Sequence, residues 1–274
     1  MAAGSQEVQN LFKGLPTQNH GSAWEQLWTT SLTPWDRSGP SPPLADLLSS
    51  RPDLFPLPRG GEEGRRRTAL VPGCGRGHDV LLLASFGYDA VGLDLAETAI
   101  REARANEEAA AADETRYPLA EGVVERGRVT WVAGDFFSDA FLREAGVDSF
   151  DIIFDYTFSC ALPMSLRPKW AARMSRLLSP AATGRLVILQ FPNGKSLSLP
   201  GPPWGVNSDM YLALLSRPGE EIPCDDDGNV PGADRIERTA DGLRRLELIV
   251  PTRTHTIGVA ADGTITDRVS VWSH

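Results

Sequence analysis

Apolar runs of strand length alternate with stretches of helical spacing from residue 67 to the end of the chain. The short apolar runs, bounded by Gly, Pro or polar residues, have the pattern of buried strands. We predict strands over Thr68–Val71, Tyr88–Leu93, Arg128–Val132, Phe150–Phe154 and Arg185–Phe191, and a closing pair over Leu246–Val250 and Thr264–Trp272. Helical spacing predicts helices over His78–Phe86, Ala96–Ala112, Ser138–Glu144, Leu166–Leu178 and Ser208–Ser216. This alternation predicts an α/β fold with a mostly parallel sheet and helices on both faces.

The N-terminal part of the chain lacks this alternation. Residues 1–23 are polar, and we expect an arm or a short helix there. Trp24 and Trp28 follow four positions apart, so on a helix they share one face. We therefore divide the chain into an N-terminal segment and linker, residues 1–66, and a domain over residues 67–274.

Two stretches of the domain do not fit the alternating pattern. Residues 113–126 have no clear period and are expected to be an irregular insertion. Residues 220–228 are acidic and rich in turn residues, which indicates a solvated loop or a lid.

Polar or glycine-rich residues follow four of the predicted strands: Gly73–Gly77, Asp94, Asp135 and Asp155-Tyr156. In an open α/β sheet, ligands bind at the carboxyl ends of the strands. The glycines let the backbone bend sharply and come close to a ligand. Their spacing is G-x-G-x-G rather than the dinucleotide G-x-G-x-x-G, and a tight strand-to-helix turn is the alternative interpretation.

Asp94 ends the second predicted strand, about 20 residues after the glycines, where an acid can accept both hydroxyls of a ribose. NAD and S-adenosylmethionine (SAM) both carry such a ribose, and a cap for the following helix is the alternative. Asp135, followed by Phe136, ends the third strand, where a carboxylate can read an adenine edge and an apolar ring can pack on it. An ordinary helix cap is the alternative there also.

Composition and charge exclude several classes of function. The formal net charge of −9 disfavours nucleic acid and anionic membranes as partners. The three cysteines are far apart and show no zinc spacing, so we expect no metal and no disulfide framework. The polar first residues and the lack of an apolar run of about 18 residues predict neither a signal peptide nor a membrane span. We expect a cytoplasmic protein.

Several motifs together resemble the thiopurine methyltransferase superfamily, and in particular its plant thiol/halide methyltransferases and their fungal relatives. They are Val-Pro-Gly-Cys-Gly-Arg-Gly-His-Asp at 71–79, Val-Gly-Leu-Asp at 91–94, Phe-Asp-Ile-Ile-Phe-Asp-Tyr at 150–156, Gly-Pro-Pro-Trp at 201–204, and the N-terminal Trp24-x3-Trp28-x6-Trp35-Asp36. The resemblance runs from about Trp24 to Val206. It implies a seven-stranded class I SAM-dependent methyltransferase fold with SAM as the cofactor.

The resemblance also implies roles for single residues. Trp24, Trp28 and Trp35 would come from the segment that closes over SAM, and aromatic faces attract a sulfonium cation without attacking it. Core packing is the alternative interpretation of these tryptophans. The remaining implied roles are Gly73 against the methionine part of SAM, Asp94 on the ribose, Asp135 and Phe136 beside the adenine, and Tyr156 near the reacting end.

Tyr156 also bears on the acceptor. Thiopurine enzymes proper carry an arginine at this position, so the tyrosine favours the thiol/halide branch. We take Tyr156 as the candidate catalytic group on the acceptor side and Trp204 as a candidate lining residue of the acceptor pocket. The expected acceptor is a small thiol, sulfide or halide, which needs loss of water and a fixed line of attack rather than a strong base.

We expect the enzyme to be a monomer. Two alternatives stay open at this point. An NAD-dependent dehydrogenase would need a different glycine spacing and a later catalytic His or Lys. A non-catalytic SAM-binding module, or a methyltransferase for another small molecule, would keep the glycines and Asp94.

Overall fold

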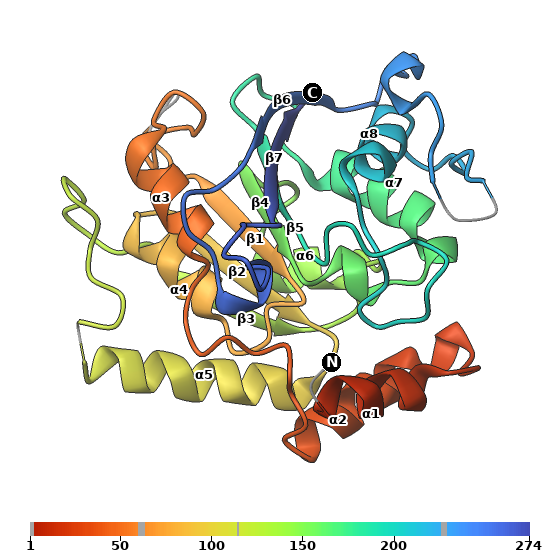
Figure 1. Cartoon of the computed structure of the whole chain (residues 1–274). Coiled ribbons are helices and arrows are strands. Elements are labelled where there is room, and N and C mark those ends of the chain that lie inside the picture. The colour runs from red at the N-terminus through yellow and green to blue at the C-terminus, as the bar shows by residue number, and fades with distance from the viewer. Residues whose placement is uncertain (1–2, 60–63, 114, 226–228) are drawn as a thin grey trace. The chain divides into compact units, whose positions relative to one another are not determined.

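The computed structural model describes residues 3–59, 64–113, 115–225 and 229–274. They contain a seven-stranded sheet in the order β3-β2-β1-β4-β5-β7-β6 (Figure 1). The strands pair in parallel through β3, β2, β1 and β4, whereas β7 is antiparallel to both β5 and β6. The predicted mostly parallel sheet is therefore confirmed. The strands are β1 (Thr68–Pro72), β2 (Asp89–Asp94), β3 (Val129–Ala133), β4 (Ile152–Tyr156), β5 (Arg185–Gln190), β6 (Arg244–Ile249) and β7 (Arg268–Ser273).

The last strand is shorter than the sequence predicts. It begins at Arg268 rather than at Thr264. Residues before it form a turn of their own, in which Val259 bridges to Ile265 and Gly263 has a positive φ of 86°. This local pairing uses backbone groups that the strand would otherwise need.

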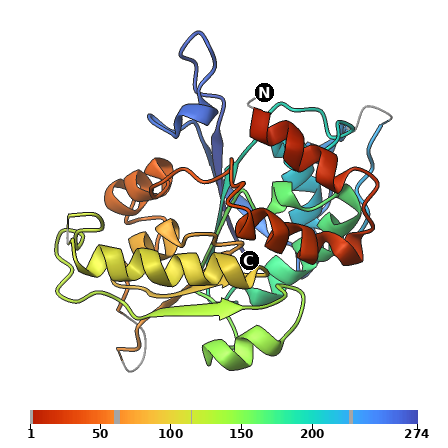
Figure 2. The same cartoon turned by 90° about the horizontal axis from the view of Figure 1, so that it is seen from below.

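Contacts divide the chain into two units, one of residues 15–153 and the other of residues 1–14 with 154–274. The division of the sequence at residue 66 stays a prediction. In the 15–153 unit, α5 and α6 lie on opposite faces of β3 (Figure 2). The helices of this unit are α2 (His20–Thr29), α3 (Pro42–Ser50), α4 (His78–Ser85), α5 (Glu97–Ala111) and α6 (Ala140–Ala145), with the 3-10 turn η1 (Thr17–Asn19).

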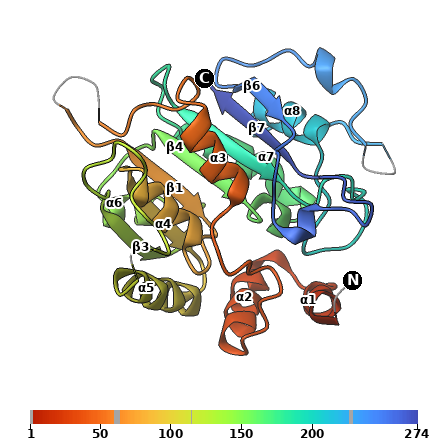
Figure 3. The same cartoon turned by 60° about the vertical axis from the view of Figure 1, so that its left-hand side comes forward.

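The other unit contains β5, β6 and β7 and the packed pair α7 and α8 (Figure 3). β5 is almost wholly buried, because only its first residue, Arg185, is partly exposed. The helices of this unit are α1 (Ala3–Phe12), α7 (Arg167–Leu177) and α8 (Ser208–Ser216), with 3-10 turns η2 (Ser159–Ala161), η3 (Met164–Leu166), η4 (Ala233–Arg235) and η5 (Thr256–Gly258).

Of the two predictions for the N-terminal stretch, an arm or a short helix, the short helix is confirmed from residue 3 onward, and both α1 and α2 bury apolar residues. Residues 113 and 115–126 are irregular, as predicted, and so are residues 220–225 of the acidic stretch. Residues 226–228 of that stretch lie outside the described residues. Within the described ranges, no helix combines the length and the apolar character that crossing a bilayer requires.

Candidate cofactor and acceptor sites

The turn after β1 depends on glycine. Gly73, Gly75 and Gly77 have φ angles of 60°, 52° and 73°, a left-handed region that other residues enter only with strain. The Cys74 N–H donates a hydrogen bond of 3.0 Å to the Leu93 carbonyl, which ties the turn to β2. Gly77 is the N-cap of α4, the residue just before the helix begins at His78. The structure thus has a turn between strand and helix here, as the sequence predicted, and contact of its glycines with a cofactor stays a prediction.

Gly77 has a packing reason of its own. A Cβ at Gly77 would lie 2.1 Å from the Trp131 ring, and one at Gly92 would lie 2.5 Å from the same ring. Trp131 is buried, and its Nε1 donates to Glu107 Oε2 at 2.6 Å. Gly77 and Gly92 therefore make room for an indole inside the fold, whereas Gly73 and Gly75 shape the turn itself.

Asp94 organises the glycine turn from the end of β2. Its Oδ2 accepts the Gly75 N–H at 3.0 Å, and its Oδ1 accepts the Ala96 N–H at 3.0 Å. The side chain is half-buried, and burial raises the pKa of this carboxyl to about 6, with the nearby charge of Glu25 adding to the rise. Each carboxylate oxygen keeps a further lone pair, so the group can still accept hydroxyl donors.

Another residue caps the helix after Asp94. Glu25 on α2 accepts the Thr98 N–H at 3.1 Å and the Thr98 hydroxyl, in the first turn of α5. A carboxylate there also suits the positive end of the helix. Asp94 is therefore not the N-cap of α5. That position is Ala96, whose N–H Asp94 accepts.

Trp24, Trp28 and Trp35 form one cluster, which we call the aromatic cover. The Trp35 ring centroid lies 5.2 Å from that of Trp24 and 5.9 Å from that of Trp28, both edge-to-face. Trp28 also packs on Ala96 and Ala99 at the start of α5. Its ring lies 3.3 Å from where a Cβ of Gly75 would be. The structure thus brings the cover against the glycine turn.

An ion pair fastens the aromatic cover to the same turn. Asp36, next to Trp35, has its Oδ2 2.6 Å from Arg76 Nη1 and its Oδ1 3.4 Å from His78 Nε2. Burial alone would raise the pKa of Asp36, but the His78 contact, the Ser38 N–H and the Arg76 charge together hold it at about 2. Asp36 is therefore ionised at neutral pH.

Asp135 and Phe136 lie where β3 ends. β3 pairs with β2 so that Ala133 faces Asp94, which places Asp135 just beyond the same edge of the sheet. The Asp135 side chain is exposed and accepts the Phe137 N–H at 2.9 Å, whereas Phe136 is buried. This turn leaves the second oxygen of Asp135 available to a ligand.

The unit that contains residues 154–274 holds the acceptor-side candidates. Tyr156 is buried at the end of β4, and its ring stacks on that of His255 at 5.9 Å and 7°. Phe191 packs edge-on against Tyr156 at 6.4 Å. Sequence reasoning missed His255, because a single histidine among threonines in a loop carries no motif or spacing.

Trp204 packs within the same unit against the N-terminal helix. Its ring lies 6.3 Å from that of Phe12, edge-to-face. The backbone N–H of Trp204 donates to the Cys160 carbonyl at 2.8 Å. Buried Cys160 thus contributes its backbone to holding the Trp204 loop. A lining role for Trp204 stays a prediction.

Asp155, next to Tyr156, has structural partners. It is 1% exposed and accepts hydrogen bonds from the Ser159 N–H, the Ser159 hydroxyl and Trp170 Nε1 at 3.0, 3.1 and 3.0 Å. Ser159 in turn contacts the Tyr211 hydroxyl at 2.7 Å. Burial raises the pKa of Asp155 to about 6. These bonds fix the turn that follows β4.

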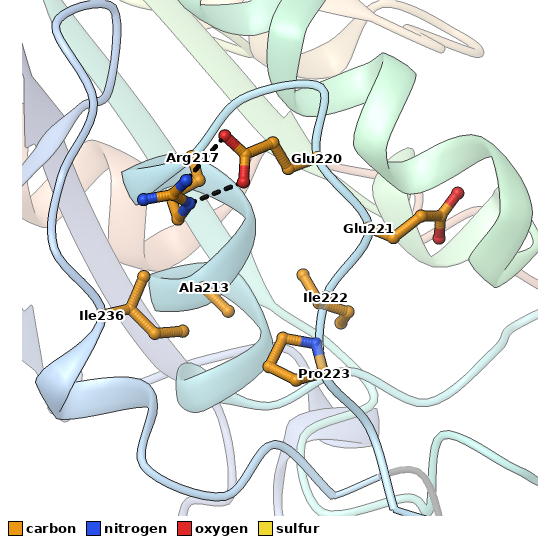
Figure 4. Close-up of a pocket in the computed structure, with 7 residues that line it drawn as sticks. All are labelled: Ala213, Arg217, Glu220, Glu221, Ile222, Pro223 and Ile236. Carbon is orange, nitrogen blue, oxygen red and sulfur yellow. Dashed lines mark hydrogen bonds and ion pairs between the residues drawn. The ribbon is translucent and has the colours of Figure 1, made fainter.

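A small surface pocket lies elsewhere in this unit (Figure 4). It measures about 210 Å³ and contains the Arg217–Glu220 ion pair. None of the predicted site residues lines it, so we assign it no part in the reaction. Among the residues that the structure describes, no group of three His, Cys, Asp or Glu side chains could hold a metal.

Comparison with known proteins decides the family. A model described as thiopurine S-methyltransferase (TPMT) matches residues 19–247. The chain belongs to the thiopurine S-methyltransferase family. It is a SAM-dependent methyltransferase, and the resemblance seen in its motifs is confirmed.

Two plant proteins are similar to this methyltransferase over most of its length. A probable thiol methyltransferase 2 of Arabidopsis thaliana is 34% identical over 80% of this chain and 83% of its own. Thiocyanate methyltransferase 1 of the same plant is 34% identical over 70% of each chain. The family model's match over residues 19–247 includes the glycine turn, which is therefore part of a family-wide match rather than an isolated motif.

A solved structure supports the fold. The 1,6-didemethyltoxoflavin-N1-methyltransferase of Burkholderia thailandensis aligns with a TM-score of 0.54 and 17% identity, covering 92% of this chain and 85% of that one. This likeness confirms the class I SAM-dependent methyltransferase fold. The dehydrogenase alternative is excluded, because the matching family and the similar plant proteins are methyltransferases.

Proposed function

We propose that this methyltransferase transfers a methyl group to the sulfur of a small thiol or sulfide, and that halide ions are a further acceptor class. The plant relatives named as thiol and thiocyanate methyltransferases support a sulfur acceptor. The observation that carries the proposal is the aromatic cover packed on the glycine turn, because it suits a sulfonium donor.

Together, the residues near the glycine turn match the three parts of SAM: methionine, ribose and adenine. Gly73 and Gly75 bring the backbone close to the methionine part, and the half-buried Asp94 accepts the ribose hydroxyls. Asp135, with one oxygen already fixed by the Phe137 N–H, and the buried Phe136 receive the adenine. The aromatic cover faces the sulfonium, where each ring adds about 0.5–2 kcal/mol.

When bound, SAM supplies an electrophilic methyl: a lone pair of the acceptor sulfur forms the new S–C bond as the old one breaks and its electrons leave with S-adenosylhomocysteine (SAH). A thiol also releases its proton to solvent, whereas thiocyanate and halides carry none. The chain's own part is to bind, orient and exclude water. No strong base is required of it.

The acceptor side is built from aromatic groups. Tyr156, Phe191 and His255 pack ring against ring. Such a surface removes water from a thiolate or a large soft anion and so makes it more nucleophilic. We therefore assign Tyr156 to the acceptor side, with Trp204 as a second lining residue.

The test is an acceptor panel with the purified full chain and labelled SAM. Hydrosulfide, thiocyanate, a small aromatic thiol, a thiopurine, iodide and chloride are compared, and volatile methyl products and SAH are both measured. We expect turnover with the small sulfur acceptors, slower turnover with iodide, and little with the thiopurine. Tight SAH binding without turnover of any acceptor would instead indicate a non-catalytic SAM-binding module.

Two properties complete the proposal. We expect a monomer in solution, which light scattering during gel filtration measures. We also expect a cytoplasmic location, since the structure has free cysteines at Cys74, Cys160 and Cys224, as is usual in a reducing compartment. Fractionation of the source cells would test the location.

A further inference from the structure

The irregular segment 115–126 makes its most buried contact near the aromatic cover. Tyr117 is only 4% exposed, although the residues around it are mostly exposed. Its hydroxyl lies 2.6 Å from His78 Nδ1, and the two rings stack at 6.4 Å and 28°. The segment is thus anchored to the first residue of α4.

Two further bonds hold the segment to the glycine turn. Asn106 on α5 donates to the Arg76 carbonyl at 2.8 Å and lies 3.4 Å from the Tyr117 hydroxyl. Arg116, the residue before Tyr117, donates to Asn106 Oδ1 at 2.7 Å. The Arg76 carbonyl is therefore held by Asn106 of α5, and the segment in turn contacts Asn106 through Arg116 and Tyr117.

The other nitrogen of His78 faces the aromatic cover. His78 Nε2 lies 3.4 Å from Asp36 Oδ1, and Arg76 Nη1 lies 2.6 Å from Asp36 Oδ2. Asp36 follows Trp35 directly, so its two partners fix the position of that indole against Trp24 and Trp28. A continuous chain of contacts runs from Tyr117 through His78 to Asp36 and the cover.

We propose, building on the function proposed above, that Asp36 and Tyr117 are positioning residues for SAM. Asp36 holds the aromatic cover on the glycine turn, and Tyr117, from the irregular segment, holds His78 in the orientation that meets Asp36. Neither side chain needs to touch the cofactor. If the contacts of either Asp36 or Tyr117 are lost, the aromatic cover can move away from the glycine turn, and SAM binds less tightly. The rate of methyl transfer in the bound complex is unchanged.

The first measurement is calorimetric binding of SAH to the purified full chain, which needs no turnover. Asp36→Asn removes the charge and keeps the shape, and we expect about tenfold weaker SAH binding. Tyr117→Phe keeps the ring and removes only the hydroxyl, and we expect about threefold weaker binding. With a working acceptor, KM for SAM should rise in step while kcat at saturating SAM stays within about twofold.

Two matched variants separate positioning from general stability. Asp151 is a carboxylate that is more deeply buried than Asp36 and is paired to Arg67 at 2.9 Å. Tyr88 is a buried tyrosine whose hydroxyl donates to the Pro56 carbonyl. Neither contacts the cover or the turn. Asp151→Asn and Tyr88→Phe should lower the melting temperature but leave SAH binding within about twofold of the wild type.

The double variant Asp36→Asn/Tyr117→Phe tests whether the two residues act through one chain of contacts. We expect its loss of SAH affinity to be smaller than the two single losses combined, since both act on the same cover. Wild-type affinity in both single variants, or equal losses in the matched controls, would overturn the proposal while the proposed function stands. Failure of the wild-type chain to bind SAH would overturn both.

Discussion

The indole of Trp28 lies directly over Gly75, so that a Cβ added at residue 75 would be 3.3 Å from the ring. Gly75 also has a φ of 52° and donates its N–H to Asp94. Because Gly75 has no side chain, Trp28 of the aromatic cover can pack against it, and its backbone N–H bonds to Asp94, the ribose-binding candidate. Both halves of the proposed SAM site depend on this residue.

Gly75→Ala should weaken SAM binding as well as destabilise the fold. The left-handed backbone costs about 1–2 kcal/mol once a Cβ is present. The added methyl also presses on Trp28, which we expect to displace the cover and to weaken SAH binding about tenfold. Gly146→Ala is the matched control, because Gly146 has a φ of 70° and nothing within 4 Å of its Cβ position. Both variants should lose similar stability in urea unfolding, and only Gly75→Ala should lose SAH affinity.

Asp94 should make SAM binding depend on pH. Burial raises the pKa of its carboxyl to about 6. Ribose hydroxyls donate to the ionised form, so SAM affinity should fall as the pH drops through about 6. Asp94→Asn should remove this dependence, and Asp94→Ala should weaken binding by at least about tenfold, or about 1.4 kcal/mol. An Asp94→Asn variant that keeps the wild-type pH profile would assign the titration to another group.

The same carboxyl affects stability with the opposite sign. Because the folded pKa of about 6 is above the usual 3.8, the folded state binds more protons between these values. The free energy of unfolding that Asp94 contributes should therefore fall as the pH rises from about 4 to about 6. Asp79 and Asp155 have similarly raised pKa values and contribute in the same way. Comparing urea unfolding of wild type and Asp94→Asn across this range separates the contribution of Asp94 from theirs.

The sequence pattern predicted the elements of the sheet because each strand is a short apolar run with a clear boundary. β2 ends at Asp94, as the polar residue after its apolar run indicated. β4 differs from the prediction, because it begins at Ile152 and runs on through Asp155-Tyr156 rather than ending at Phe154. Trp24 and Trp28 share a face, as their spacing predicted, since both meet Trp35. Such features depend on residues close together in the chain, so they could be predicted from the sequence.

The contacts that fasten these elements together could not be predicted. Asp36 and Arg76 are 40 positions apart, His78 and Tyr117 are 39 apart, and Glu25 and Thr98 are 73 apart. A single charged or polar residue does not indicate its partner across such distances. The tertiary fold chooses it, so only the structure revealed what anchors residues 115–126.

Trp170→Phe should destabilise the turn after β4. The indole Nε1 donates to Asp155 Oδ2 at 3.0 Å inside the core, and both side chains are at most 1% exposed. Removing the donor leaves a buried carboxylate oxygen with one partner fewer, at a cost of about 1–3 kcal/mol. The pKa of Asp155 should rise further, so the loss of stability should be larger at pH 8 than at pH 5. A loss that is equal at both pH values would show that cavity formation, rather than the hydrogen bond, accounts for it.

Tyr156→Phe separates the acceptor side from the cofactor side. The phenylalanine keeps the stack on His255 and the edge contact with Phe191, and it removes only the hydroxyl. We expect KM for a thiol acceptor to rise about threefold to tenfold, with SAH affinity unchanged within about twofold.

Tyr211→Phe is the control, since it removes another buried hydroxyl in the same unit, the one that contacts Ser159. Tyr211→Phe should lower the melting temperature without changing either constant. If Tyr156→Phe weakens SAH binding instead, Tyr156 belongs to the cofactor side, and the acceptor must be placed by other residues.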